Sequence, residues 1–203
     1  MDGYEKYDIQ EEDPYLIPDS TCLRNLLRIT DTQKLNEAEA AISSAAIAEL
    51  IAGPVEPTFD LVHLCNIHQH LFRDVYDWAG QPRKTEIAKG DRLFLPYQKI
   101  EEVSSQIFDA LHRDNLLSGL ELTPIAHKAA YYLGRINMVH PFREGNGRVQ
   151  RVLLDQLVEM SGFAFQWSAV SGWRMAEACR DARQVEPDYR RLERLLAMCI
   201  TRL

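Results

Sequence analysis

Residues 140–151 constrain the fold of this chain more than any other segment. They read His-Pro-Phe-Arg-Glu-Gly-Asn-Gly-Arg-Val-Gln-Arg, and combine an imidazole, a carboxylate, two glycines and three arginines. Apolar side chains then recur at helical spacing before Gly162, a typical stop signal; they are Val149, Val152, Leu153, Leu157 and Met160. The sequence therefore predicts a helix from about Gly147 to Ser161, entered through a glycine-flanked loop.

A helix that begins at this loop offers an anion-binding end. Its first N–H groups have no partner within the helix and carry partial positive charge. Arg148 and Arg151 stand in the first turn, where each costs roughly a few tenths of a kcal/mol against the helix dipole. The glycines at 145 and 147 allow positive φ and close approach of a ligand. Each residue alone is typical of a loop or a solvated surface, but together they favour a bound polyphosphate.

Residues 140–151 resemble the signature of Fic-domain proteins, His-Pro-Phe-x-Asp/Glu-Gly-Asn-Gly-Arg-x-x-Arg, and match every defined position. The run Asp13-Pro-Tyr-Leu, His68 with residues 75–80, and Lys89-Gly90 are also similar to that family. The resemblance covers nearly the whole chain. It implies one Fic domain over residues 1–203, an all-α, Fic-like helical bundle with a short β-hairpin flap over the active-site loop.

The resemblance also implies a reaction, because Fic proteins mostly transfer AMP from ATP to a hydroxyl side chain of another protein. His140 would be the general base that takes the proton of the attacking hydroxyl. Glu144 would hold Mg²⁺ between the α- and β-phosphates, and the loop of Gly145, Asn146 and Gly147 would bind the α-phosphate. Arg148 would bind the β-phosphate and Arg151 the γ-phosphate. Phe142 would anchor the loop in the core, and Arg143 receives no role.

One position of the signature separates two reactions. In the kinase-like branch of the superfamily, lysine replaces the second glycine and the γ-phosphate is transferred. This chain has Gly147, which favours transfer of the nucleotidyl group. Two alternatives stay open: an enzyme of the same fold that uses another nucleotide or a phosphocholine donor, and a non-catalytic binding module.

The remaining sequence predicts helices around one hairpin. We expect an extended arm over residues 1–20, a catalytic core over 59–162 and C-terminal helices over 163–203. Helices are predicted over residues 31–52, 59–78 and 98–115, from Thr123 as N-cap with Pro124 following to about 139, and after 171 and 187. Strands over 85–89 and 92–95 flank Gly90-Asp91 and form the predicted flap.

The flap is the expected docking site for the target. In Fic proteins a hairpin of this kind pairs with the backbone of the target, as in strand addition. The residues implied are Ile87, Ala88, Lys89, Gly90 and Leu93. A purely structural hairpin is the alternative that the residues leave open.

Regulation is expected to come from a partner. Fic activity is commonly blocked by a Ser/Thr-x-x-x-Glu helix whose glutamate pairs with the second arginine of the signature. None of the sixteen glutamates has Ser or Thr four positions before it. The resemblance to stand-alone toxins then implies a separate small antitoxin that contacts Arg151. It also suggests ATPase subunits of type II topoisomerases as protein substrates.

Composition and residue spacing restrict the ligands and the cellular location expected for this chain. A net charge of −7 argues against nucleic acid as a direct ligand, and the polar N-terminus and the lack of a long apolar stretch predict a cytoplasmic protein. The four cysteines lack metal or redox spacing and are expected to be reduced thiols. His63, Cys65, His68 and His70 could bind zinc, but the apolar spacing around them favours ordinary helix positions.

Overall fold

The computed structural model describes residues 13–53, 55–90 and 92–203, so most of the predicted arm lies outside the described residues. The described chain contains seven α-helices: α1 (Thr32–Ala52), α2 (Leu61–Phe72), α3 (Ile100–Arg113), α4 (Leu122–Val139), α5 (Asn146–Glu159), α6 (Gly172–Asp181) and α7 (Arg190–Cys199). Short 3-10 turns occur at Tyr97–Lys99, Asn115–Leu117 and Trp167–Ala169. The predicted helical bundle is confirmed.

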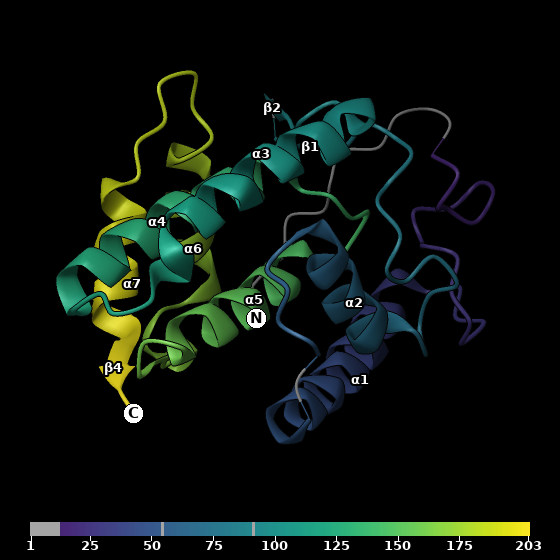
Figure 1. Ribbon diagram of the computed structural model, residues 1–203. Coiled ribbons are helices and arrows are strands. Elements are labelled where there is room, and N and C mark those ends of the chain that lie inside the picture. The colour runs from purple at the N-terminus through teal and green to yellow at the C-terminus, as the bar shows by residue number, and fades with distance from the viewer. Residues whose placement is uncertain (1–12, 54, 91) are drawn as a thin grey trace.

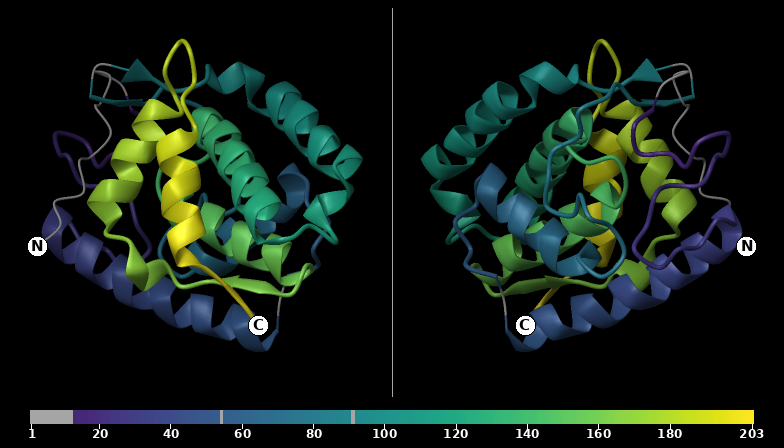
Figure 2. Two further views of the ribbon diagram at one scale, coloured as in Figure 1. Left: turned by 90° about the vertical axis from the view of Figure 1, so that its left-hand side faces the viewer. Right: turned by 90° about the vertical axis from the view of Figure 1, so that its right-hand side faces the viewer.

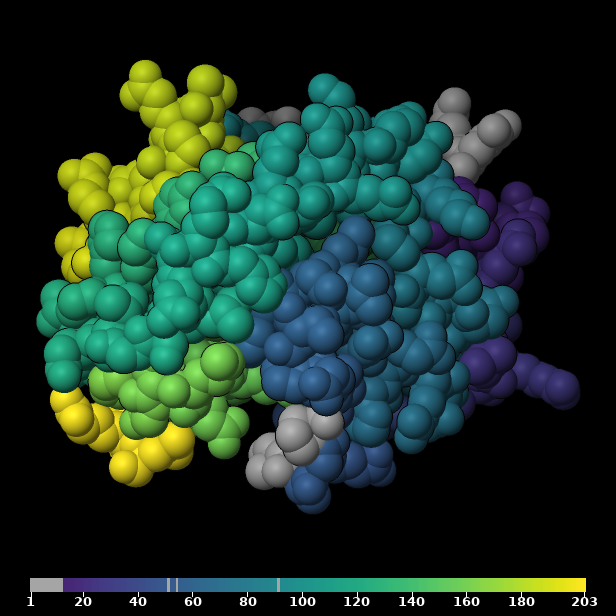
Figure 3. All heavy atoms as spheres, in the orientation of Figure 1, coloured from purple at the N-terminus to yellow at the C-terminus, as the bar shows by residue number. Residues whose placement is uncertain are grey.

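Helices α2, α4 and α5 make most of the helix–helix contacts of the bundle (Figure 1). Helix α4 packs on α3, α5 and α7, while α2 packs on α1, α3 and α5. Helix α1 lies along the edge of the molecule opposite the β1–β2 hairpin in both views of Figure 2. In Figure 3, α2, α3 and α4 cover most of α5 on the face shown. The loop between α4 and α5 lies against α2, whose His68 ring stacks on Phe142.

The hairpin is shorter than predicted. Strands β1 (Ala88–Lys89) and β2 (Arg92–Leu93) pair antiparallel, with Ala88 opposite Leu93. A second antiparallel pair, β3 (Phe163–Phe165) with β4 (Ile200–Arg202), was not predicted from the sequence. Its strands are three residues long and distant in sequence, so neither has enough alternation to be recognised alone.

The prediction of one helix over residues 59–78 is wrong. Helix α2 begins after Asp60, whose side chain accepts the N–H of His63, and ends at Phe72. Turns follow α2 and bring Gly80 back against the helix. Gly80 has φ 80°, and its N–H donates to Nδ1 of His68. A Cβ at this glycine would lie 2.7 Å from Oε1 of Gln69.

Other helix boundaries were predicted more closely. Asp31 caps α1 by accepting the N–H of Lys34, and Ser171 caps α6. Thr123 is not the N-cap of α4, because the helix begins at Leu122 with Glu121 as its N-cap, two residues earlier than predicted. Helix α5 begins at Asn146, one residue before the predicted start. Among the described residues, no helix is both long enough and apolar enough to cross a bilayer.

Candidate active site

The loop between α4 and α5 is closed by the side chain of Asn146. Its Oδ1 accepts the N–H of Phe142 at 2.9 Å, and its Nδ2 donates to the carbonyl oxygen of Phe142 at 2.7 Å. Asn146 is buried, and Phe142 stacks on the His68 ring with centroids 4.0 Å apart. Both polar atoms of the Asn146 side chain are therefore used to shape the loop, and only the backbone N–H of Asn146 is left to contact a ligand directly.

His140 ends α4 in a left-handed conformation. Its φ is 48°, an unusual value for a residue with a Cβ, and such strain is found at functional sites. Its Nδ1 lies 3.0 Å from the carbonyl oxygen of Asn137. Because a carbonyl oxygen only accepts, Nδ1 must carry the proton. The neutral ring then keeps its lone pair on Nε2, the nitrogen able to take a proton.

Arg83, which the sequence analysis missed, holds the backbone of His140. Its Nε donates to the carbonyl oxygen of His140 at 2.9 Å, and its Nη1 to that of Thr85 at 2.8 Å. Its Nη2 donates to the carbonyl oxygens of Leu95 and Val139. The side chain is fully buried. One guanidinium thus joins both ends of the hairpin to the end of α4.

Aromatic and cationic groups cover the His140 ring. Phe94 stacks on it with centroids 3.8 Å apart, and Cζ of Arg183 lies 3.9 Å from the Phe94 centroid. Burial lowers the pKa of His140 well below its usual value, with Arg183, Arg83 and Lys89 adding to the effect. The imidazole is therefore unprotonated at neutral pH.

His68 supports the loop from α2. Since its Nδ1 accepts the N–H of Gly80, its Nε2–H donates to the carbonyl oxygen of Glu144 at 3.1 Å. Burial lowers its pKa to about 3. His63, Cys65 and His70 also lie on α2, as predicted.

The carboxylate of Glu144 is half-exposed at the start of α5. Oε1 accepts the N–H of Gly145 at 2.8 Å and lies 3.7 Å from Nη2 of Arg148. Magnesium commonly takes one or two carboxylates together with substrate phosphates. An accessible carboxylate beside a helix N-terminus fits such a metal site.

Arg148 and Arg151, both in the first turns of α5, differ in their surroundings. Arg148 donates to Glu39 of α1 and to Oγ of Ser43 at 2.9 Å, contacts that the sequence analysis did not predict. Arg151 is half-buried, and no hydrogen bond or ion pair joins it to another residue of the described chain. Burial raises the pKa of Asp155, four residues along α5, and the charge of Arg151 acts against this rise.

Arg143, to which the sequence analysis assigned no role, forms a buried ion pair. Its Nε lies 2.7 Å from Oδ2 of Asp13, and both side chains are nearly inaccessible. Tyr15 adds a second contact by accepting the N–H of Lys84 at its hydroxyl, 3.1 Å away. The described end of the arm thereby braces the loop.

The flap presents fewer side chains than predicted. Ile87 is buried and cannot serve as an exposed docking side chain, because strand alternation turns it inward. Ala88 and Lys89 are half-buried, while Gly90 and Leu93 are exposed. Leu93, with 61% exposure, is the most exposed apolar side chain among the described residues of the hairpin.

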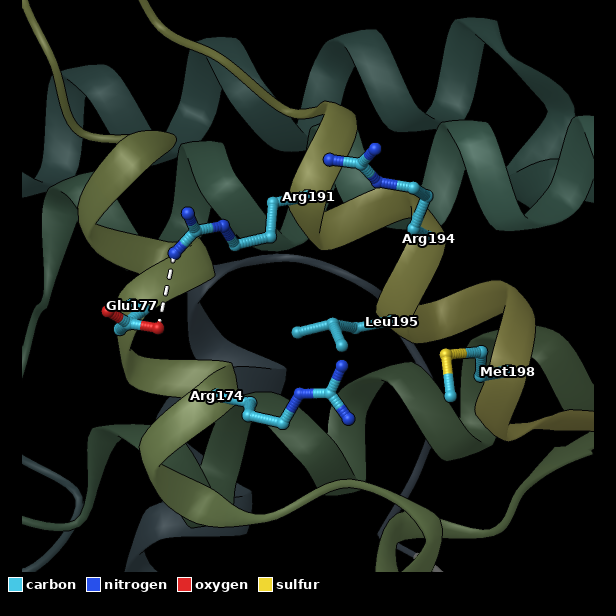
Figure 4. A pocket seen from close by; sticks show the side chains of 6 residues that line it. All are labelled: Arg174, Glu177, Arg191, Arg194, Leu195 and Met198. Carbon is cyan, nitrogen blue, oxygen red and sulfur yellow. Dashed lines mark ion pairs between the residues drawn. The ribbon is translucent and has the colours of Figure 1, made fainter.

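A surface hollow lies apart from this loop. It has a volume of about 330 Å³ and its six lining residues all come from α6 and α7: Arg174, Glu177, Arg191, Arg194, Leu195 and Met198 (Figure 4). The Arg191–Glu177 ion pair spans it at 3.2 Å. It contains no histidine that could act as a base, so the chemistry is assigned to the loop.

The two glycines of the loop should respond differently to alanine. Gly145 has φ 80°, and a Cβ there would collide with the Phe72 ring; Gly147 has open space around its Cβ position. We expect Gly145→Ala to lower the free energy of unfolding by about 1–3 kcal/mol. Gly147→Ala should change it by less than about 0.5 kcal/mol. Urea denaturation measures both, and equal losses would contradict the assignment.

Acid should destabilise the fold below pH 6.5. Burial lowers the pKa of His63, His68 and His140 in the folded chain, so the unfolded chain takes up more protons below pH 6.5. Each histidine can remove up to about 1.4 kcal/mol of stability per pH unit. Asp155, whose pKa burial raises to about 6, opposes this trend. Equal unfolding free energies at pH 7.5 and 5.5 would contradict this expectation.

Comparison with known proteins places the chain in a family. Residues 58–158 match the model of the Fic/DOC family. The chain is 39% identical to the protein adenylyltransferase VbhT of Bartonella schoenbuchensis over 82% of this chain but only 35% of that protein. It is 36% identical to the probable protein adenylyltransferase Fic of Salmonella typhimurium, over 81% of this chain and 82% of the relative.

Comparison with solved structures supports the same family. The crystal structure of BepC of Bartonella tribocorum, with bound AMPPNP, matches with a TM-score of 0.87 and 27% identity, covering 94% of this chain and 97% of that one. The helical bundle and the small two-stranded sheets are therefore those of the Fic fold. The chain belongs to the Fic/DOC family.

Proposed function

We propose that this chain is a protein adenylyltransferase that moves AMP from ATP to a hydroxyl side chain of another protein. One observation carries the proposal: the closed loop joins an unprotonated imidazole at the end of α4 to the anion-binding start of α5. The names of the relatives and the nucleotide analogue bound to BepC support this class of substrate.

In the proposed reaction, the substrate hydroxyl attacks the α-phosphorus of ATP. Nε2 of His140 accepts the hydroxyl proton while the new O–P bond forms. The bond between the α-phosphorus and the bridging oxygen breaks, and pyrophosphate leaves. Phosphoryl chemistry of this kind depends mainly on positioning and charge neutralisation.

The nucleotide is held by groups at the start of α5. The N–H groups of Gly145, Asn146 and Gly147 face the α-phosphate, Arg148 binds the β-phosphate and Arg151 the γ-phosphate. Glu144 would hold Mg²⁺, which neutralises charge on the phosphates. Gly145 reaches the phosphate once its N–H leaves the Glu144 carboxylate, to which it donates in this structure.

A small antitoxin with a Ser/Thr-x-x-x-Glu helix is the proposed regulator. Its glutamate would pair with Arg151, a half-buried arginine to which no hydrogen bond or salt bridge runs from the described residues. Such pairing would displace the γ-phosphate. The chain should then be toxic alone and tolerated together with its partner, whereas harmless high-level expression of the active chain alone would count against the regulator.

The function is tested by incubating the chain and its His140→Ala variant with ATP, Mg²⁺ and a bacterial lysate. The α-labelled nucleotide should mark a protein band that the variant does not mark. Mass spectrometry of that band should give an added AMP; an added phosphocholine or a different nucleotide would overturn the donor assignment. Purified ATPase subunits of type II topoisomerases are the first defined substrates to assay.

Leu93 should matter for target modification more than for catalysis itself. Leu93→Glu places a charge on the exposed side chain of β2 and should reduce target labelling about tenfold while sparing auto-modification. Val62→Glu is the matched control, because Val62 has 63% exposure on α2. If Leu93→Glu lowers labelling of the target and of the chain itself equally, the docking role is wrong.

A further inference from the structure

Helix α1 buries a carboxylate where an apolar side chain is expected. Leu35, Glu39, Ala46 and Leu50 recur at helical spacing and all face the core, with Glu39 at 5% exposure. Ser43 lies on the same stripe and is fully buried. An isolated buried carboxylate would be very unfavourable, so the contacts of Glu39 must offset its desolvation.

Both oxygens of Glu39 have partners. Oε1 accepts from Nη2 of Arg148, and Oε2 accepts the hydroxyl of Tyr76. Ser43 donates to the carbonyl oxygen of Ala40 at 3.3 Å and accepts from Nη1 of Arg148 at 2.9 Å. Glu39 and Ser43 therefore form a polar cradle for the guanidinium of Arg148, 109 positions along the chain from Glu39, and Tyr76 holds the Glu39 carboxylate in place.

The cradle leaves part of the guanidinium accessible. Glu39 lies on the inner side, with 7% of its side chain accessible, whereas Arg148 keeps 21%. Phe72 supports the guanidinium as well, with its ring centroid 4.7 Å from Cζ. A guanidinium has five N–H groups, and Glu39 with Ser43 uses two. Arg148 can therefore bind an anion without leaving Glu39.

We infer that Glu39 is a positioning residue which, with Ser43 and Tyr76, fixes Arg148 for the β-phosphate of the nucleotide. The inference deepens the proposed function and rests on it. A planar guanidinium binds phosphate best when its orientation is set beforehand. The opposite possibility is that Glu39 competes with the phosphate for Arg148, which predicts tighter nucleotide binding once the carboxylate is removed.

The test compares Glu39→Gln and Ser43→Ala with the unchanged chain in titration calorimetry with AMP, ADP and ATP. Gln keeps the size of the side chain and a hydrogen bond to Tyr76, but removes the charge. We expect affinity for ADP and ATP to fall about tenfold for Glu39→Gln and less for Ser43→Ala. Affinity for AMP, which lacks a β-phosphate, should stay within twofold. Glu37→Gln, exposed on the same helix, is the matched control.

Several results would overturn the inference. Tighter ADP binding by Glu39→Gln would identify a competing carboxylate, and equal losses for all three nucleotides would identify a merely structural role. The effect of Glu39→Gln should also vanish when Arg148 is already alanine; a persistent effect overturns the pairing. If Glu39→Gln does not fold, the same comparison is decided by Ser43→Ala. Failure of the proposed function itself is distinguishable, because the unchanged chain would then transfer no AMP.

Discussion

Replacing His140 by alanine should reduce AMP transfer by roughly 10³-fold, the usual contribution of a general base. The physical reason is that Nε2 is the nitrogen left to accept the substrate proton in the proposed reaction, since Nδ1 is committed to the carbonyl oxygen of Asn137. Binding of ATP should stay within about threefold, because the proposed phosphate contacts all come from the start of α5. Single-turnover transfer and nucleotide titration measure the two quantities separately.

The control for this variant is His127→Ala. His127 lies on the same helix, is exposed, and pairs with Glu193 at 3.0 Å. It should leave both transfer and nucleotide binding unchanged. A His140 variant that loses nucleotide affinity in proportion to its rate would show that the imidazole binds the nucleotide and would contradict its role as base.

Lowered basicity has a consequence for the pH profile of this reaction. Because burial lowers the pKa of His140, the base is unprotonated throughout the neutral range. It is a weaker proton acceptor than a solvated imidazole, so its placement beside the nucleophile matters more than its proton affinity. The stacked Phe94 and the capping Arg183 thus favour a permanently available base.

The sequence predicted those parts of the site that are contiguous in the chain. Residues 140–151, which form the loop and the first turns of α5, contain the proposed base, a carboxylate, glycines and arginines, and the apolar-periodic helix that follows indicated an anion site. What it did not reveal is how the loop is held. Glu39, Arg83 and Asp13 contact loop residues 109, 57 and 130 positions away, and only folding brings these pairs together.

A signal for Glu39, and for its neighbour Ser43, was nevertheless present in the sequence. Glu39 and Ser43 interrupt an otherwise apolar stripe of α1, which indicates a buried polar contact without naming the partner. For Ile87 the sequence offered no such signal. The resemblance implied that it belongs to the docking flap, but one residue of register decides which side of a hairpin faces outward. The structure turns it inward.

Arg83 is the residue whose loss should damage both stability and activity most. Replacement by methionine, which keeps much of the volume, would leave the carbonyl oxygens of His140, Thr85, Leu95 and Val139 without this donor. Each buried acceptor without a partner costs about 1–3 kcal/mol. We expect the free energy of unfolding to fall by at least about 3 kcal/mol, measured by urea denaturation. Arg73→Met, on an arginine with 51% side-chain exposure, should cost less than about 0.5 kcal/mol.

The effect on activity should exceed what unfolding explains. At a temperature where Arg83→Met is still folded, the strained φ of His140 loses the hydrogen bond that holds its carbonyl oxygen, and the hairpin loses its tie to α4. Transfer should therefore fall about 10²-fold while AMP binding changes little. Arg83→Lys, with a single ammonium, can satisfy only part of the four carbonyls and should recover part of the stability. A folded Arg83→Met chain with normal transfer would show that the base needs no support from this guanidinium.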